Sequence, residues 1–113
     1  MVSAAQTRPA RGEAWLVNLH STSGREIQTT RPCVGVSPSE INAHLSTKLM
    51  AQLTSASRPA PFRMATRFAG QSGLLLLEQI RTVDARRLVK KVGQLDSLTL
   101  NAALALLRSL FSE

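Results

Sequence analysis

The chain is poor in the residues that covalent cross-links and aromatic binding surfaces require. It has one cysteine, Cys33, no tyrosine, one tryptophan and three phenylalanines in 113 residues. A single cysteine excludes an internal disulfide and agrees with a reducing compartment such as the cytoplasm. Cys33 lies in an apolar segment, and we expect it to be a small buried side chain rather than a nucleophile.

Long hydrophobic runs are also lacking. No segment approaches the roughly 20 apolar residues that span a bilayer. Residues 1–10 contain no continuous apolar run of the kind found in secretory signals. The sequence therefore predicts a soluble cytoplasmic protein. A length of 113 residues suffices for one hydrophobic core, so we expect a flexible tail over residues 1–10 and one domain over residues 11–113.

Acidic residues are half as numerous as basic ones. Seven Asp and Glu residues against fourteen Lys and Arg residues give a formal net charge of +7. A small domain with this charge attracts polyanions, of which nucleic acid is the commonest inside a cell. An acidic protein partner is the alternative, and both hold together if that partner blocks a surface that binds nucleic acid.

Several motifs of metal and nucleotide chemistry are missing. The chain has no CxxC, no GxxxxGK and no GxSxG motif. Its only histidines are His20 and His44, and no cluster has the spacing of metal ligands. We therefore expect no metal ion and no cofactor.

Short apolar segments separated by polar turns make up most of the chain. They predict strands over residues 14–19, 33–36, 48–53, 62–68, 74–77 and 88–92. The four leucines 74–77 fit a strand or a buried helix, and their short run after Gly73 favours the strand. Many short strands without β-α-β alternation indicate a mainly β protein, a small barrel with added helices.

Two segments carry signals of helix starts. Ser37 and Glu40 have the spacing of a capping box, which predicts a short helix over residues 38–45. Asp96 suits the N-cap of a second helix over residues 97–112. The leucine-rich face of this helix is wider than one core contact requires, which indicates a subunit interface or a deep groove around it.

A series of motifs begins at the first predicted strand. Its members are Arg11, Gly12, Glu13, Trp15 and Val17, then Gly24, Glu26, Arg31 and Pro32, and later Gln79, Arg81, Thr82, Val83 and Asp84. In order and spacing, these residues resemble the MazF/PemK/Kid family of toxin endoribonucleases over about residues 11–111. The resemblance implies an SH3-like barrel of the CcdB/MazF/PemK kind and a homodimer. It also implies a cognate antitoxin protein as partner and single-stranded mRNA as substrate.

Cleavage of RNA needs no metal ion, because the 2′-OH can attack the adjacent phosphorus and leave a 2′,3′-cyclic phosphate and a 5′-OH. The enzyme must neutralise the phosphorane-like transition state, align the 2′-OH and move two protons. Arginine suits the first task because its planar fork binds two phosphate oxygens and stays charged. The resemblance assigns this role to Arg31 and a phosphate-binding hydroxyl to Thr54. The alternatives are a structural arginine and a threonine that completes a turn.

Two glutamates are the other catalytic candidates. Glu26 matches the Gly-x-Glu of the family, and it either accepts the 2′-OH proton or holds Arg31 by an ion pair. Glu78 lies where Kid has an aspartate and is the second candidate base. Leu76, however, lies where Kid has an arginine, which removes the cation expected beside Glu78. The chain is therefore closer to an Arg/Thr version of the site than to the Kid version.

Polar and basic side chains are expected to bind the RNA. The candidates are Arg25, Ser55, Gln79, Arg81, Arg86 and Arg87. Arg25 lies where Kid has a histidine, and an arginine can only bind or stabilise charge at pH 7. Arg81 has an alternative role as an ion-pair partner of Asp84. Arg86 and Arg87 form a basic cluster with Lys90 and Lys91 that could equally be a solvated face.

Base recognition has few aromatic candidates. Trp15, Phe62, Phe68 and Phe111 all lie in apolar segments and are expected in the core. Ile27 and Thr29 depart from the family pattern, where Gln and Gly are usual, so the base preference of the loop is open. Three functions remain: an endoribonuclease toxin, a CcdB-like toxin that acts on DNA gyrase by protein contact, and a catalytically weakened RNA-binding module.

Overall fold

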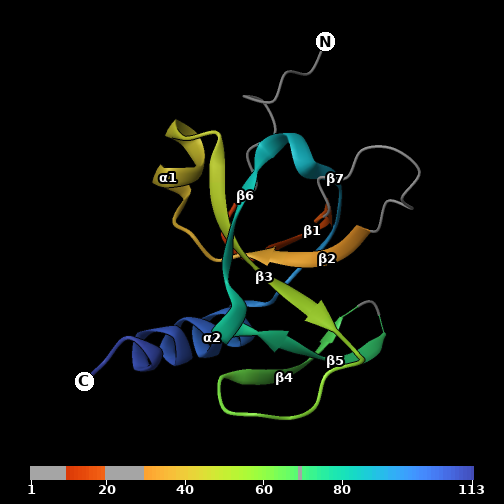
Figure 1. The fold of residues 1–113 in the computed structure, drawn as a ribbon, viewed down its shortest axis with the longest axis vertical. Coiled ribbons are helices and arrows are strands. Elements are labelled where there is room, and N and C mark those ends of the chain that lie inside the picture. Colours follow the sequence, from red (N-terminus) through yellow and green to blue (C-terminus); the bar gives the residue numbers. More distant parts are fainter. Residues whose placement is uncertain (1–9, 20–29, 69) are drawn as a thin grey trace.

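The computed structural model describes residues 10–19, 30–68 and 70–113. Its elements are β1 (Glu13–Asn18), β2 (Thr30–Gly35), α1 (Ser39–His44), β3 (Thr47–Thr54), β4 (Arg63–Phe68), β5 (Gln71–Leu76), the 3-10 turn η2 (Leu77–Gln79), β6 (Arg81–Asp84), the 3-10 turn η3 (Ala85–Arg87), β7 (Leu88–Gln94) and α2 (Ser97–Leu110). The predicted fold class is confirmed, because the chain folds as an antiparallel sheet with a short helix and a C-terminal helix (Figure 1). The predicted tail falls outside the described residues except for residue 10, and it stays a prediction.

The strands form one seven-stranded antiparallel sheet in the order β4-β5-β3-β2-β1-β7, with β6 paired to β3. β3 is the strand that joins the parts of this sheet. Its residues 47–50 pair with β6, whereas Leu53 and Thr54 pair with β5. In Figure 1, β3 accordingly runs from the side of β6 and α1 down to β4 and β5. Its C-terminal end, with Thr54, therefore lies where these two parts of the sheet meet.

Two groups of buried apolar side chains hold the fold together. The larger consists of Ala14, Val34, Val36, Ala51, Leu53, Leu75, Leu77, Leu95 and Ala103, and the smaller of Val17, Cys33, Met50 and Val83. Phe68 of β4 packs against the larger group and lies over Gly93 of β7, where an added Cβ atom would come within 2.6 Å of the ring. This side-chain contact joins the two outermost strands of the sheet order.

The predicted start of the first helix is wrong in its chemistry. α1 begins after Pro38, which caps it without a side-chain hydrogen bond. The Ser37 hydroxyl instead donates to Asn42 Oδ1 at 2.7 Å and accepts from the Leu49 backbone N–H at 3.1 Å. Ser37 is therefore used to fasten α1 to β3, a tertiary role that the capping-box spacing does not predict.

The second helix begins as predicted, since Asp96 accepts the Thr99 backbone N–H at 2.7 Å. Its apolar face is only partly covered, because Leu98 is 85% exposed and Phe111, just after the helix, is 73% exposed. The prediction that Phe111 lies in the core is wrong. Within the part of the chain that the structure describes, no helix is long and apolar enough to cross a membrane.

Candidate active site

The pairing of β2 with β3 brings the first two candidate residues together. The two strands run antiparallel, with Cys33 opposite Gln52 and Val34 opposite Ala51. Arg31, near the start of β2, therefore lies at the same end of this strand pair as Thr54, the last residue of β3. Two side chains 23 positions apart in the sequence thus reach one place.

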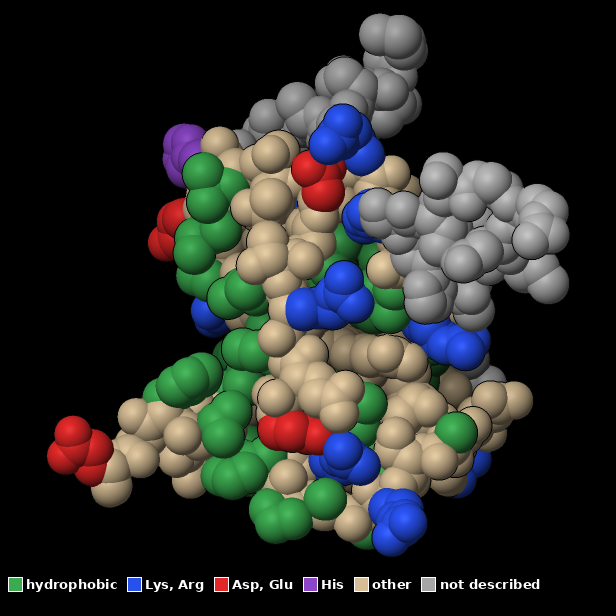
Figure 2. All heavy atoms as spheres, in the orientation of Figure 1, with side chains coloured by type: hydrophobic (Ala, Val, Ile, Leu, Met, Phe, Trp, Pro, Cys, Tyr) green, Lys and Arg blue, Asp and Glu red, His purple; other side chains and the backbone are tan. Residues whose placement is uncertain are grey.

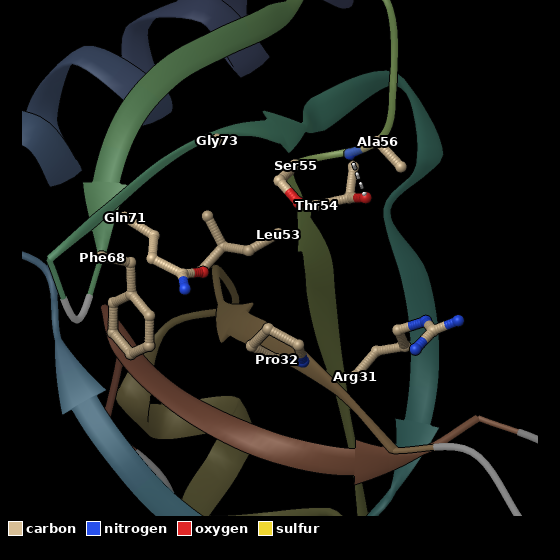
Figure 3. A pocket seen from close by; sticks show the side chains of 9 residues that line it. All are labelled: Arg31, Pro32, Leu53, Thr54, Ser55, Ala56, Phe68, Gln71 and Gly73. Atoms are coloured by element: carbon tan, nitrogen blue, oxygen red, sulfur yellow. Dashed lines mark hydrogen bonds between the residues drawn. The ribbon is translucent and has the colours of Figure 1, made fainter.

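Arg31 and Thr54 line a cavity of about 360 Å³ (Figure 3). The full set of residues around it is Arg31, Pro32, Leu53, Thr54, Ser55, Ala56, Phe68, Gln71 and Gly73. β2 contributes the first two residues, β3 and the turn after it contribute the next four, and the β4–β5 hairpin contributes the last three. The cavity has the size of sites that bind small ligands, which start at about 300 Å³.

Arg31 has the properties of a group that binds an anion. It is exposed in β2, and no carboxylate pairs with it among residues 10–19, 30–68 and 70–113. The Cys33 thiol donates to the Arg31 carbonyl at 3.8 Å. Burial raises the pKa of this thiol to about 12, so Cys33 is neutral and adds no negative charge beside Arg31.

Thr54 has a hydroxyl whose direction is set by a turn. Its Oγ1 accepts the Ala56 backbone N–H at 3.1 Å, a bond drawn in Figure 3. This is the turn-completing role considered above, and it does not conflict with phosphate binding. A hydroxyl has one donor and two acceptor lone pairs, so the accepted bond leaves the O–H of Thr54 available to an anion. Ser55, the next residue, is exposed at the cavity and adds a second hydroxyl.

Gly73 allows the strands beside Thr54 to approach closely. An added Cβ atom at this residue would lie 2.9 Å from the Thr54 carbonyl oxygen and 3.4 Å from its carbon. Real Cβ atoms essentially never come closer than 3.0 Å to a neighbour. The placement of Thr54 therefore depends on a residue without a side chain in β5.

Glu78 is held by a cation that sequence reasoning missed. Arg63 Nε and Nη2 lie 2.8 Å and 2.7 Å from Glu78 Oε2, and Gln79 Nε2 donates to the same oxygen at 3.1 Å. The Arg63 bond is the main cause that lowers the pKa of Glu78. Arg63 lies directly opposite the buried Leu76 in the β4–β5 pairing. Arg63 of β4 thus supplies the positive charge that was expected at the position of Leu76 in β5. This replacement is visible in the strand register and not in the sequence spacing.

The candidate residues do not all reach the cavity. Glu78 is absent from its lining, as are Gln79 and Arg81. Arg25 and Glu26 lie outside the described residues, so their assigned roles stay predictions. No motif in the sequence marks Phe68, Gln71 and Gly73 as site residues. A pocket lining assembled from four strands leaves no spacing signal in the sequence.

The predicted basic cluster is divided among separate contacts. Arg86 pairs with Asp84 at 3.1 Å, so Asp84 binds Arg86 rather than Arg81. Arg87 donates to the Asn18 carbonyl at 3.2 Å, and Lys91 pairs with Glu13 at 3.0 Å. On the face drawn in Figure 2, Lys and Arg side chains are scattered rather than gathered in one patch. Among the described residues, no three His, Cys, Asp or Glu side chains are grouped where they could hold a metal ion.

Known proteins resemble this chain in sequence and in structure. A family model described as "PemK-like, MazF-like toxin of type II toxin-antitoxin system" matches residues 10–111. The chain is 35% identical over 81 residues to Endoribonuclease PemK of Escherichia coli, a match that covers 67% of this chain and 61% of that protein. The match therefore spans less than two thirds of that relative's length.

Solved structures share the fold over almost the whole chain. MazF from Deinococcus radiodurans has a TM-score of 0.74 at 25% identity, covering 90% of this chain and 94% of that chain. A MazE–MazF structure from the same organism has a TM-score of 0.71 at 25% identity with the same coverage.

Proposed function

Because the chain belongs to the PemK-like, MazF-like toxin family of type II toxin–antitoxin systems, we propose that it is an endoribonuclease. Its substrate is single-stranded RNA, which it cuts without a metal ion. The observation that carries the proposal is the meeting of Arg31 and Thr54 at one cavity through the register of β2 and β3. The relative from Escherichia coli, which bears the name endoribonuclease, supports the same activity.

The proposed reaction is a transesterification within the RNA. The 2′-oxygen bonds to the adjacent phosphorus, the bond from phosphorus to the 5′-oxygen breaks, and the 5′-oxygen takes a proton. Arg31 binds two non-bridging oxygens and neutralises the charge that grows on them. The Thr54 O–H, directed by its turn bond, donates to the same phosphate and holds it in line. The products have a 2′,3′-cyclic phosphate and a 5′-OH.

Two carboxylates are candidates for the proton from the 2′-OH. Glu78 is ionised at neutral pH, but Arg63 holds it and lowers its pKa, which makes it a weaker base. We therefore assign Glu78 a positioning role for the RNA-binding candidate Gln79, whose amide donates to the same carboxylate oxygen as Arg63. Glu26 is the candidate base that remains, because its loop directly precedes Arg31 in the sequence.

Two protein partners complete the proposal. The exposed Phe111 lines a hollow along α2 together with Leu104 and Leu107, and Leu98 near the start of the same helix is exposed as well. Hydrophobic side chains gather over this end of the molecule in Figure 2, and we assign it to the contact of a homodimer. The net charge of +7 suits an acidic antitoxin that covers the RNA-binding surface. The proposal includes a cytoplasmic location, because the proposed substrate is RNA and a chain with one cysteine suits a reducing compartment.

The test is cleavage of a long single-stranded RNA in EDTA, followed by mapping of the product ends. We expect cyclic phosphate and 5′-OH ends from the wild type. Arg31→Ala is expected to lower the rate by about 10²–10³-fold, the size of effect seen when one donor to an oxyanion is removed. Arg58→Ala is the matched control, because Arg58 is exposed and does not line the cavity. Equal activity of Arg31→Ala and wild type would refute the assignment.

The same RNA, measured for cleavage and binding beside an assay of DNA gyrase, separates the competing functions. Intact RNA together with inhibition of DNA gyrase would identify a toxin of the CcdB kind. RNA that is bound in a salt-dependent way but never cut would identify a binding module.

A further inference from the structure

The cavity at Arg31 and Thr54 has a second end with different chemistry. Figure 3 shows the Phe68 ring and the Gln71 side chain together on the side away from the Arg31 guanidinium. Pro32 lies between this pair and Arg31. Phe68 is the only aromatic residue among the nine that line the cavity. The cavity thus has a cationic end with hydroxyls and an apolar end with one amide. A nucleotide has the same division, into a phosphate and a base.

Phe68 is held as a rigid platform rather than a mobile side chain. It is the last residue of β4 and packs on the buried core. Its ring lies over Gly93, where an added Cβ atom would come within 2.6 Å of Cε1 and 2.8 Å of Cζ. The ring is only half-buried, so part of it faces the cavity. A fixed, partly exposed ring suits stacking with a base, because little conformational entropy is lost on binding.

Gln71 supplies hydrogen-bonding groups next to this ring. It lies directly opposite Phe68 in the β4–β5 pairing. Gln71 is exposed, and among the residues that the structure describes none is recorded as a hydrogen-bond partner of its amide. An amide offers one acceptor oxygen and two donor hydrogens. Such a group can bind the edge of an unpaired base, as polar side chains do in single-stranded RNA recognition.

We propose that Phe68 and Gln71 form a subsite for one nucleobase beside the phosphate held by Arg31 and Thr54. The ring stacks on the base, and the Gln71 amide hydrogen-bonds to the edge of that base. The proposal deepens the proposed function and rests on it for the identity of the substrate as RNA. A volume of about 360 Å³ admits one base with its phosphate rather than several nucleotides. The subsite therefore determines sequence preference at one position next to the cut.

The competing explanation is that Phe68 serves the core alone. Packing against the buried cluster and Gly93 would by itself account for its position. The two explanations differ at Gln71, whose exposed side chain contributes nothing to a core. They also predict different effects of replacing Phe68. If the ring serves the core alone, its loss weakens the binding of RNA with bases and of abasic RNA equally.

The test compares binding of RNA hexamers of equal charge that carry or lack bases. The probes are four 2′-O-methyl homopolymers, which cannot be cut because the 2′-oxygen is blocked, and one abasic hexamer. We expect the wild type to bind at least one homopolymer more tightly than the abasic chain. Phe68→Leu is expected to lower the ratio of the affinities for homopolymer and abasic RNA by about fivefold or more, because stacking on one aromatic ring contributes at least that factor. Gln71→Leu is expected to lower the same ratio.

Matched controls separate the subsite from general effects on folding. Phe62→Leu removes the same volume from another half-buried ring of the same core that does not line the cavity. Gln94→Leu changes an exposed glutamine of β7 outside the cavity. Both control variants should bind homopolymer and abasic RNA with the same affinity ratio as the wild type. Because Gln71 is exposed, its variant tests the subsite even if Phe68→Leu fails to fold.

The outcomes for the subsite and for the nuclease are distinct. An unchanged difference between homopolymer and abasic RNA in Gln71→Leu and in any folded Phe68 variant overturns the subsite, whether or not RNA is cut. A wild type that never cuts RNA, but whose preference for bases depends on Phe68 and Gln71, overturns the nuclease and leaves the subsite standing. If both proposals are right, the two variants also relax the mapped cleavage preference at one position.

Discussion

Gly73→Ala is expected to disturb the active site by pushing two strands apart. The new Cβ atom would lie 2.9 Å from the Thr54 carbonyl oxygen, below the 3.0 Å that real Cβ atoms respect. The neighbour is backbone and cannot rotate away, so β5 must move relative to the end of β3. Overpacking of this kind costs about 1–3 kcal/mol. The lower entropy of the unfolded alanine chain offsets about 0.4–1 kcal/mol of it.

Values from the middle of both ranges leave a net loss of about 1–2 kcal/mol in the free energy of unfolding. For a domain of this size, such a loss lowers the Tm by roughly 5–10 °C, which circular dichroism measures directly. Thr54 moves with the strand, and misplacement of a catalytic group by 1 Å can cost about 10²-fold. For a shift of a few tenths of an ångström, we expect RNA cleavage at 25 °C to fall by about tenfold.

Gly35→Ala is the matched control for this prediction. Gly35 is also a strand glycine, but the nearest atom to its added Cβ is the Ala10 carbonyl oxygen at 3.7 Å, an ordinary contact. Its Tm should stay within about 2 °C of the wild type, and its cleavage rate should not change. A Gly73→Ala protein as stable and as active as the Gly35→Ala protein would refute the idea that the close approach at Thr54 matters.

The remaining predictions concern single groups. Thr54→Ala should lower cleavage by about tenfold or more while the Tm changes little, and equal losses in both would make its hydroxyl merely structural. Because Arg63 lowers the pKa of Glu78, their pair stabilises the fold above the ordinary glutamate value of 4.5 and loses this effect as the pH falls below it. Urea unfolding of Glu78→Gln and wild type should differ by at most about 1 kcal/mol at pH 7, since water screens an exposed pair, and by less at pH 3; a difference that grows at pH 3 would contradict the sign. With a pKa of about 12 and 1% exposure, native Cys33 should resist a thiol reagent at pH 8 and react fully in denaturant, whereas rapid labelling of the folded protein would contradict its burial.

Local sequence patterns were sufficient for most of the secondary structure. Apolar segments bounded by turns predicted the strands, and Asp96 predicted the start of α2 because an N-cap acts within three residues. β6 was not predicted as a strand, since its four residues include only one fully buried side chain, Val83. The capping box at Ser37 failed because Asn42 and Leu49 compete for the same hydroxyl.

The site required information that no local pattern contains. Motifs along the chain were enough to indicate the family, the fold class, and Arg31 and Thr54 as candidates. The folded structure was needed to show that these two residues share a cavity, that Arg63 holds Glu78, and that the Phe68 ring borders the cavity. Strand register explains this difference. A shift of one residue turns every side chain of a strand to the opposite face, and register is set by the packing of the whole core rather than by neighbours along the chain.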